Sequence, residues 1–165
     1  MTNASVNQTE VTGSDAKARP PKSARSARRR SREFALQGLY RWQLNAQDPT
    51  IVAAEVGELE EFDQADLKHF RTLFYGVIAD VEDLRAQVSP HLDRPIIELS
   101  PIEHNILLLG AYEFTHHLEI PYRVVINEGV ELAKSFGGTD GFKYINGVLD
   151  KLAAVARAIE VGKKG

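Results

Sequence analysis

The chain has 165 residues, a net charge of −3 and no cysteine. This length suits one domain or two small, tightly packed subdomains. The lack of cysteine excludes disulfides, zinc–thiolate sites and thiol catalysis, and it is typical of a cytoplasmic protein. The longest apolar run, residues 106–112, is too short to span a bilayer, and the N-terminus lacks the apolar core of a signal peptide, so we expect no membrane partner.

The charges are distributed unevenly along the chain. Residues 16–32 carry eight basic residues and no acidic one, whereas residues 33–165 carry 12 basic and 21 acidic residues. A basic arm on an acidic body predicts a polyanionic partner, and the arm could fold back onto the body when that partner is absent. Residues 1–26 are poor in apolar side chains that would offset the entropy of ordering, so we expect a disordered extension.

The first helical pattern follows this extension. Ala35, Leu39 and Trp42 recur at helical spacing, with further apolar residues beside them, which predicts a central helix. Asp48-Pro49 interrupts the pattern, and a shorter helix over about residues 50–61 is expected after it.

A long apolar stripe follows. Apolar residues recur every three or four positions from Phe70 to Val88, which predicts one helix with Asp63 as its cap. Ser89-Pro90 ends this helix, and residues 90–99 are expected to form a linker.

The C-terminal half begins with a clear helix start, Ser100-Pro101-Ile102-Glu103, in which Ser caps, Pro occupies the first turn and Glu completes a capping box. Pro121 opens another helix, which ends at Phe136-Gly137-Gly138 with glycine in the left-handed position. Asp140 is expected to cap the last helix. Its core-facing residues are predicted to be Ile145, Val148, Leu149, Leu152, Val155 and Ile159.

These patterns predict an all-α fold. We expect six to seven helices in two packed subdomains, residues 27–89 and 100–162, within one helical domain over residues 27–162. No segment alternates with the period of a strand.

Two other kinds of site can be weighed from the residues. Glu113 and His116 have the Glu-x-x-His spacing of di-iron bundles, but the only other similar pair, Asp66 and His69, has the wrong acid. We therefore interpret His116 and His117 as exposed residues near a helix end and expect no metal site. Residues 136–141 match no phosphate-binding glycine motif, so neither a cofactor nor enzymatic activity is expected.

The basic arm is the strongest functional signal. Arg28, Arg29, Arg30 and Arg32 fall within five positions, and guanidinium groups bind phosphate and stack on bases. On the first turns of a helix they would oppose its dipole, and a placement that costs stability favours a function. Nucleic-acid binding is the favoured interpretation, with a solvated tail or a nuclear address signal as alternatives.

Three stretches of the chain resemble the NusB transcription antitermination family. They are residues 27–45, residues 69–77 and the most specific one, IPYRVVINEGVELAKSFGGTDGFKYINGVLDKLA at residues 120–153. The resemblance covers about residues 27–160. It implies two small helical subdomains, in agreement with the periodicity.

The resemblance implies RNA binding without catalysis. Members of this family pair with the ribosomal protein NusE, recognise boxA RNA in nascent ribosomal transcripts, and help an RNA polymerase elongation complex with other Nus factors to read through terminators. A homodimer that uses the NusE-facing surface is possible. The alternatives are a helical adaptor that acts through protein contacts, and the NusB-like domain of a methyltransferase, which the lack of a cofactor-binding loop disfavours.

The resemblance also assigns residues. It implies RNA binding by Arg28, Arg29, Arg30, Arg32, Lys143 and Tyr144, although Tyr144 could equally be an aromatic residue at the core edge. Asp140 in the same loop would restrain RNA affinity.

Two further pairs of residues are assigned in the same way. The resemblance implies a NusE-facing role for Tyr40 and Glu103, although the capping box also explains Glu103. Asn127 and Asn146 are interpreted as residues with buried or capping hydrogen bonds rather than as ligands.

Overall fold

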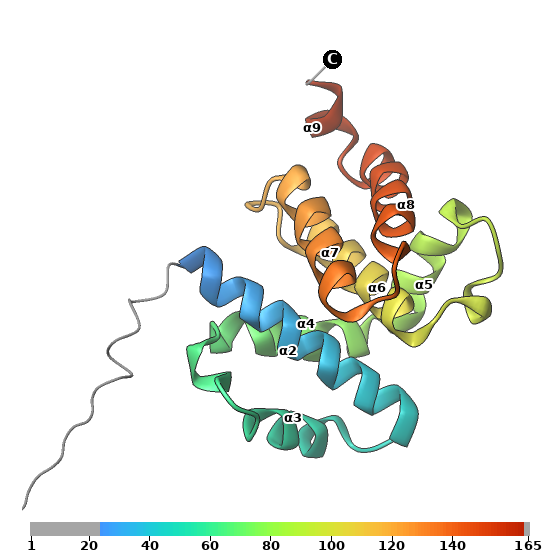
Figure 1. The fold of residues 1–165 in the computed structure, drawn as a ribbon. Helices are drawn as coiled ribbons and strands as arrows, with labels where there is room; N and C mark the ends of the chain where they lie inside the picture. The colour runs from blue at the N-terminus through green and yellow to red at the C-terminus, as the bar shows by residue number, and fades with distance from the viewer. Residues whose placement is uncertain (1–23, 164–165) are drawn as a thin grey trace, which may run out of the picture.

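The computed structural model describes residues 24–163 and confirms the all-α prediction. Figure 1 shows α2 (Ala24–Asn45) crossing the molecule, with α3 (Pro49–Gly57) and α4 (Leu67–Ala79) packed beside it. The C-terminal helices α6 (Pro101–His116), α7 (Tyr122–Phe136) and α8 (Gly141–Ala156) form the other part of the fold. None of the helices within this range is long and apolar enough to cross a membrane.

Helix α2 begins at Ala24, three residues earlier than predicted; residues 1–23 of the expected disordered extension lie outside the described residues. Ala35 and Leu39 of α2 are fully inaccessible as predicted, whereas Trp42 is only partly buried against the core. The predicted interruption is correct, because Asp48 caps α3 by accepting a hydrogen bond from the Thr50 backbone N–H at 2.8 Å.

The helix predicted from the apolar stripe is in fact two helices, α4 and α5 (Val81–Val88). Asp80 separates them with a non-helical backbone (φ −107°, ψ 20°). The apolar period continues across this break, so both helices bury their stripe and the pattern hides the break. The predicted cap at Asp63 is also wrong. Asp66 caps α4 instead, accepting from the His69 backbone N–H at 3.0 Å, while Asp63 lies in the 3₁₀ helix η2 (Phe62–Gln64).

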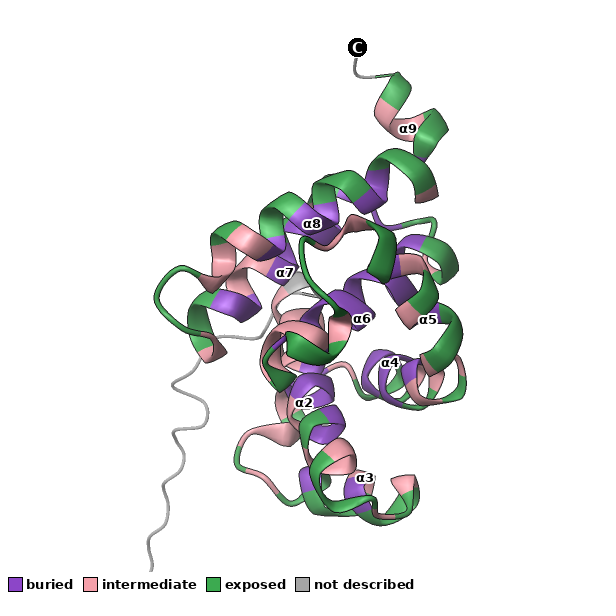
Figure 2. Ribbon diagram, turned by 90° about the vertical axis from the view of Figure 1, so that its right-hand side faces the viewer, coloured by how far each residue is buried: buried purple, intermediate pink, exposed green. Residues whose placement is uncertain are grey.

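The linker after α5 contains two 3₁₀ turns, η3 (Ser89–His91) and η4 (Ile96–Glu98). Helix α6 then starts as predicted, with Ser100 Oγ accepting from the Glu103 backbone N–H at 3.1 Å. Residues 105–114 of α6 are all buried, which makes it the central helix in Figure 2.

Close packing of α6, α7 and α8 depends on two glycines. A Cβ on Gly110 of α6 would lie 2.8 Å from a methyl carbon of Leu149, and a Cβ on Gly129 of α7 would lie 2.7 Å from another. Both distances are shorter than van der Waals contact, so a side chain at either position would force Leu149 of α8 to shift. One hydrophobic core joins these helices to α2 and α4.

The predicted helix ends near residue 140 need correction. Gly137 has φ −95° and ψ −173°, an extended rather than left-handed backbone. A Cβ on Gly137 would lie 2.8 Å from the Ala133 carbonyl oxygen, so glycine is required there for space. Asp140 occupies the N-cap position of α8, but its side chain makes no capping hydrogen bond.

The last predicted helix also divides in two. Helix α8 ends at Ala156, and α9 (Ala158–Gly162) follows after Arg157. Val155 and Ile159, predicted to face the core, are 68% and 80% exposed. The Arg157 side chain is buried instead and donates to the carbonyl oxygens of Phe114 and His117 at 2.7 and 3.0 Å, so it satisfies the C-terminal end of α6.

Candidate nucleic-acid interface

The first turns of α2 place arginine side chains against carboxylates of the body. Arg28 Nε lies 3.6 Å from Asp66 Oδ2, and Arg30 Nη1 lies 2.6 Å from Glu61 Oε1. All four side chains are partly exposed, so these pairs contribute little to stability and can exchange partners. The basic arm could therefore release these carboxylates when a phosphate offers a stronger acceptor.

Arg29 combines a buried partner with an exposed side chain. Its Nε and Nη2 donate to Glu128 of α7 at 3.0 and 2.9 Å. Glu128 is 2% exposed, whereas the Arg29 side chain is 40% exposed. The hydrogen bonds to Glu128 raise the pKa of Arg29. Arg29 thus neutralises a buried carboxylate while part of its guanidinium group stays open to solvent.

Arg32 lies in the interior. Its Nε donates to both carboxylate oxygens of Glu113 in α6 at 3.0 and 3.1 Å, and its side chain is only 5% exposed. His69 donates to the same carboxylate at 2.9 Å. Burial alone would raise the pKa of Glu113, but the hydrogen bond from His69 and the charge of Arg32 outweigh burial and lower it.

The burial of Arg32 does not fit the predicted contact with RNA. Arg32 follows Arg28 by four residues and Arg29 by three, so the helical period turns it toward the same side of α2, one turn deeper into the fold. Arg32 borders the hollow described below, but its guanidinium group already pairs with Glu113 and Glu128, so a phosphate would have to compete with two buried carboxylates. We therefore assign Arg32 a structural role.

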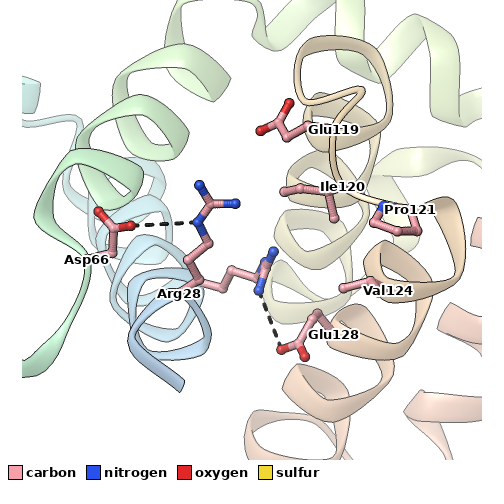
Figure 3. A pocket seen from close by; sticks show the side chains of 8 residues that line it. Arg28, Asp66, Glu119, Ile120, Pro121, Val124 and Glu128 are labelled. Carbon is pink, nitrogen blue, oxygen red and sulfur yellow. Dashed lines mark ion pairs between the residues drawn. The ribbon is translucent and has the colours of Figure 1, made fainter. Parts of the chain in front are cut away.

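A hollow of about 340 Å³ opens between α2, the start of α4 and the loop before α7. Figure 3 shows Arg28 reaching into it, with Asp66 on one side and Glu119, Ile120 and Pro121 on the other. Both positively and negatively charged side chains line the hollow, so Arg28 does not lie in a purely cationic groove.

Lys143 and Tyr144 lie at the start of α8, away from the arginines. Lys143 is exposed and pairs with Asp140 at 3.7 Å. Tyr144 packs at the core edge, and its hydroxyl donates to Asp93 Oδ1 at 3.2 Å. This packing fits the alternative interpretation of Tyr144 as a core-edge aromatic, although its ring is not fully buried.

Helix α7 connects the two groups of predicted RNA-binding residues. Glu128, the partner of Arg29, and exposed Lys134 are six residues apart on α7, which corresponds to about 9 Å along a helix. The Lys134 amino group lies 5.2 Å from the ring centroid of Phe142 in α8. One cation, Lys134, therefore lies on α7 between the start of α2 and the start of α8, and it also pairs with Glu131 at 3.9 Å.

The two residues predicted to face NusE lie where α2 crosses α6. Gln43 and Asn105 join these helices by reciprocal amide hydrogen bonds of 3.0 and 3.1 Å. Tyr40 is 36% exposed one turn before Gln43, and partly exposed Glu103 is two residues before Asn105. A Cβ on Gly141 would lie 3.3 Å from Glu103 Oε2, so Glu103 also borders the start of α8.

Two interpretations of polar residues were wrong. Asn127 and Asn146 are exposed within α7 and α8, where they neither fill the core nor cap a helix. His117 is also largely buried rather than exposed: its side chain is 15% accessible, and its ring packs edge-on against His69 at 5.0 Å. Across residues 24–163, no three His, Asp or Glu side chains are placed to hold a metal ion.

The residues that neutralise the arginines, and the contact between the linker and Tyr144, are not evident from the sequence. Glu128 is 99 positions from Arg29, and Asp93 is 51 positions from Tyr144. No local pattern relates residues so far apart, so these partners become evident only when the helices are packed.

Half-buried His104 leads to a pH-dependent prediction. Burial, and then the charge of Arg85, lower the pKa of His104 to about 4, and Arg85 Nε donates to its Nε2 at 3.3 Å. In the unfolded chain the histidine has a pKa of about 6.5, so the unfolded chain binds the proton more readily than the folded one. The contribution of neutral His104 to stability is therefore fully present above about pH 6.5 and is lost as the pH falls toward 4. Between pH 7 and 5 the loss should be about 1 kcal/mol after allowance for partial exposure.

Thermal melts of the wild type and of His104→Gln at pH 7 and 5 measure this effect. The wild type should lose about 2–4 °C more than the variant over this range. Equal decreases in Tm for the wild type and the variant would show that His104 does not cause the pH dependence.

The chain is similar to known proteins in both sequence and fold. A sequence model of the NusB family matches residues 29–154. The "Transcription antitermination protein NusB" of Bordetella pertussis (strain Tohama I) is 57% identical over 143 residues, which cover 84% of this chain and 93% of that protein. The protein of the same name from Ralstonia nicotianae is 53% identical over 154 residues, covering 93% and 99%.

Two solved structures have a similar fold. NusB of T. maritima superposes with a TM-score of 0.69 at 27% identity, covering 78% of this chain and 91% of that chain. A chain from a crystal structure of antitermination factors NusB and NusE in complex with dsRNA gives 0.66 at 27% identity, covering 76% and 95%. The family match spans more than half of the sequence, and the curated relatives cover most of it at well over 30% identity. The chain therefore belongs to the NusB family.

Proposed function

We propose that this protein is an RNA-binding transcription antitermination factor that recognises boxA RNA in nascent ribosomal transcripts. The observation that carries the proposal is the placement of Arg28, Arg29 and Arg30, whose partly exposed guanidinium groups share the first turns of α2. Their carboxylate partners hold them in place, which lowers the entropic cost of presenting them to a phosphate backbone. Lys143 and Tyr144 provide the second contact region, at the start of α8.

We further propose that NusE binds the surface around Tyr40 and Glu103. The proposal is supported by the similarity to a NusB chain crystallised with NusE and dsRNA and by the exposure of Tyr40 at the crossing of α2 and α6. The pair would act in the cytoplasm with other Nus factors on the RNA polymerase elongation complex. Its role is binding rather than catalysis.

Titration of boxA RNA and a scrambled RNA, with and without NusE, tests the proposal. Each phosphate contact on single-stranded RNA contributes about −0.7 to the slope of log affinity against log salt, so three arginines should give about −2. We expect tighter binding of boxA than of the scrambled RNA, and a further gain with NusE. A slope near zero, or equal affinity for both RNAs with NusE present, would contradict the proposal.

The ion pairs of Arg28, Arg29 and Arg30 favour one alternative, a helical adaptor that acts through protein contacts while its arginines stay neutralised. Capture of NusE without any gain in RNA affinity would identify the adaptor. Sedimentation of the protein alone and with NusE would show whether a homodimer occupies the surface proposed for NusE, because NusE would then dissociate it.

A further inference from the structure

The linker between α5 and α6 lies against the start of α8 through one assembly of three side chains. The Arg94 guanidinium carbon lies over the ring of Tyr144, 4.6 Å from its centroid. Asp93 Oδ1 accepts from the Tyr144 hydroxyl at 3.2 Å and from Arg94 Nε at 2.8 Å, and Asp93 Oδ2 accepts from Arg94 Nη2 at 3.3 Å. One carboxylate therefore holds both the phenol and the guanidinium group.

This assembly of three side chains contributes little to the stability of the fold. The side chains of Asp93 and Arg94 are 65% and 41% exposed, and exposed ion pairs contribute little to folding because water and salt screen them. The assembly nevertheless fixes the orientation of a long side chain that would otherwise be mobile. A fixed guanidinium group at the surface binds a ligand with less loss of entropy than a free one.

The position of Arg94 changes what the Tyr144 ring can do. Arg94 covers one face of the ring, so a base cannot stack directly on that face. The Arg94 side chain nevertheless keeps 41% of its surface exposed to solvent. Guanidinium groups stack on bases and keep a positive charge for phosphates, which a tyrosine cannot do.

We propose that Arg94 is a further RNA-binding residue, on which a base of the bound RNA stacks while Tyr144 supports the guanidinium group from beneath. The inference rests on the RNA-binding function proposed above, because it places an additional contact in the same site. Lys143 and Tyr144 are adjacent at the start of α8, so a strand bound at Lys143 would pass near the assembly of Arg94 and Tyr144.

The test compares boxA RNA affinity, with NusE present, for the wild type, Arg94→Ala, Arg94→Lys and the control Arg71→Ala. Arg71 is an exposed arginine of α4, so its removal changes the net charge by the same amount. Stacking of one base is worth about 5- to 100-fold in affinity, so Arg94→Ala should lose that much and Arg71→Ala about twofold or less. Arg94→Lys should keep the wild-type salt slope but recover little of the affinity, because an ammonium group does not stack.

A second measurement uses RNA with 2-aminopurine at successive positions. Quenching at one position should decrease in both Arg94 variants, and circular dichroism with thermal melts should show that both remain folded. The inference fails if Arg94→Ala binds like Arg71→Ala, or if Arg94→Lys binds like the wild type, since charge alone would then explain the contact. Loss of binding on replacing Arg28 and Arg30, without any loss on replacing Arg94, would reject the inference and retain the proposed function. A wild type that does not bind boxA RNA would reject both.

Discussion

Replacing Glu113 with alanine should lower the free energy of unfolding by about 3–5 kcal/mol, the usual cost of leaving a buried charge without its partner. Glu113 is 2% exposed and accepts hydrogen bonds from both Arg32 and His69. Without it, the Arg32 guanidinium group would keep only Glu128, at 3.6 Å, and His69 would lose its acceptor. In a chain of this size the expected decrease in Tm is about 6–20 °C.

Urea unfolding and thermal melts at pH 7 measure the effect of this substitution. Glu113→Gln should fall between the wild type and Glu113→Ala, because an amide oxygen can still accept but carries no charge. The control is Glu119→Ala, since exposed Glu119 also pairs with a histidine, His117, at 3.1 Å. Its loss should not exceed about 1 kcal/mol. A loss for Glu113→Ala as small as that of the control would contradict a stabilising role for the buried network.

The pH dependence of the same variants follows from the lowered pKa of Glu113. A carboxyl group whose folded pKa lies below its unfolded value contributes stability above the unfolded pKa, about 4.3, and loses it as the pH falls through the folded pKa. The difference in stability between the wild type and Glu113→Gln should therefore be largest near neutral pH and decrease below about pH 4.

The second large effect separates the arginines by function. The double variant Arg28→Gln/Arg30→Gln should bind boxA RNA about tenfold more weakly near physiological salt, with a salt slope smaller in magnitude by about 1.4, as expected for two lost phosphate contacts. Its stability should change by less than about 1 kcal/mol, because both residues form only partly exposed ion pairs.

Arg32→Gln should show the opposite behaviour. It should destabilise the fold strongly, because Glu113 and Glu128 would lose the guanidinium group between them, and at a temperature where it is folded its salt slope should stay near that of the wild type. RNA titrations over a range of salt, with unfolding curves for each variant, provide both readouts. If the double variant loses stability but not RNA affinity, the partly exposed arginines are structural and RNA binds elsewhere.

RNA binding at α2, as proposed above, would be an exchange of acceptors rather than the filling of an empty cationic groove. Arg28 and Arg30 lie next to Asp66 and Glu61, so a phosphate must replace a carboxylate at each of these positions. This competition limits affinity for any polyanion and favours an RNA that makes several contacts at once. It also explains how Arg28 and Arg30 lie against an otherwise acidic body.

Much of the fold could be predicted from local chemistry. The Ser100 cap, the Asp48-Pro49 interruption and the burial of α2 follow from short-range rules that hold for an isolated segment as they do within the fold. The predicted single helix over residues 70–88 failed because apolar periodicity continues across the break at Asp80. The predicted burial of Val155 and Ile159 was wrong for a related reason, because the apolar stripe of α8 extends past the last helix that could cover it.

Composition and spacings of a few residues are enough to predict that this chain is helical, that it lacks thiol chemistry, and that a cluster of arginines lies at the start of a helix. Local patterns do not predict which arginine is buried and which remain at the surface, or that Arg94 covers Tyr144; these features become evident from the packing of the helices. Burial and ion pairing depend on partners 31 to 99 positions away, such as Glu61 for Arg30 and Glu128 for Arg29, and no local pattern encodes which of the many carboxylates will meet a given arginine.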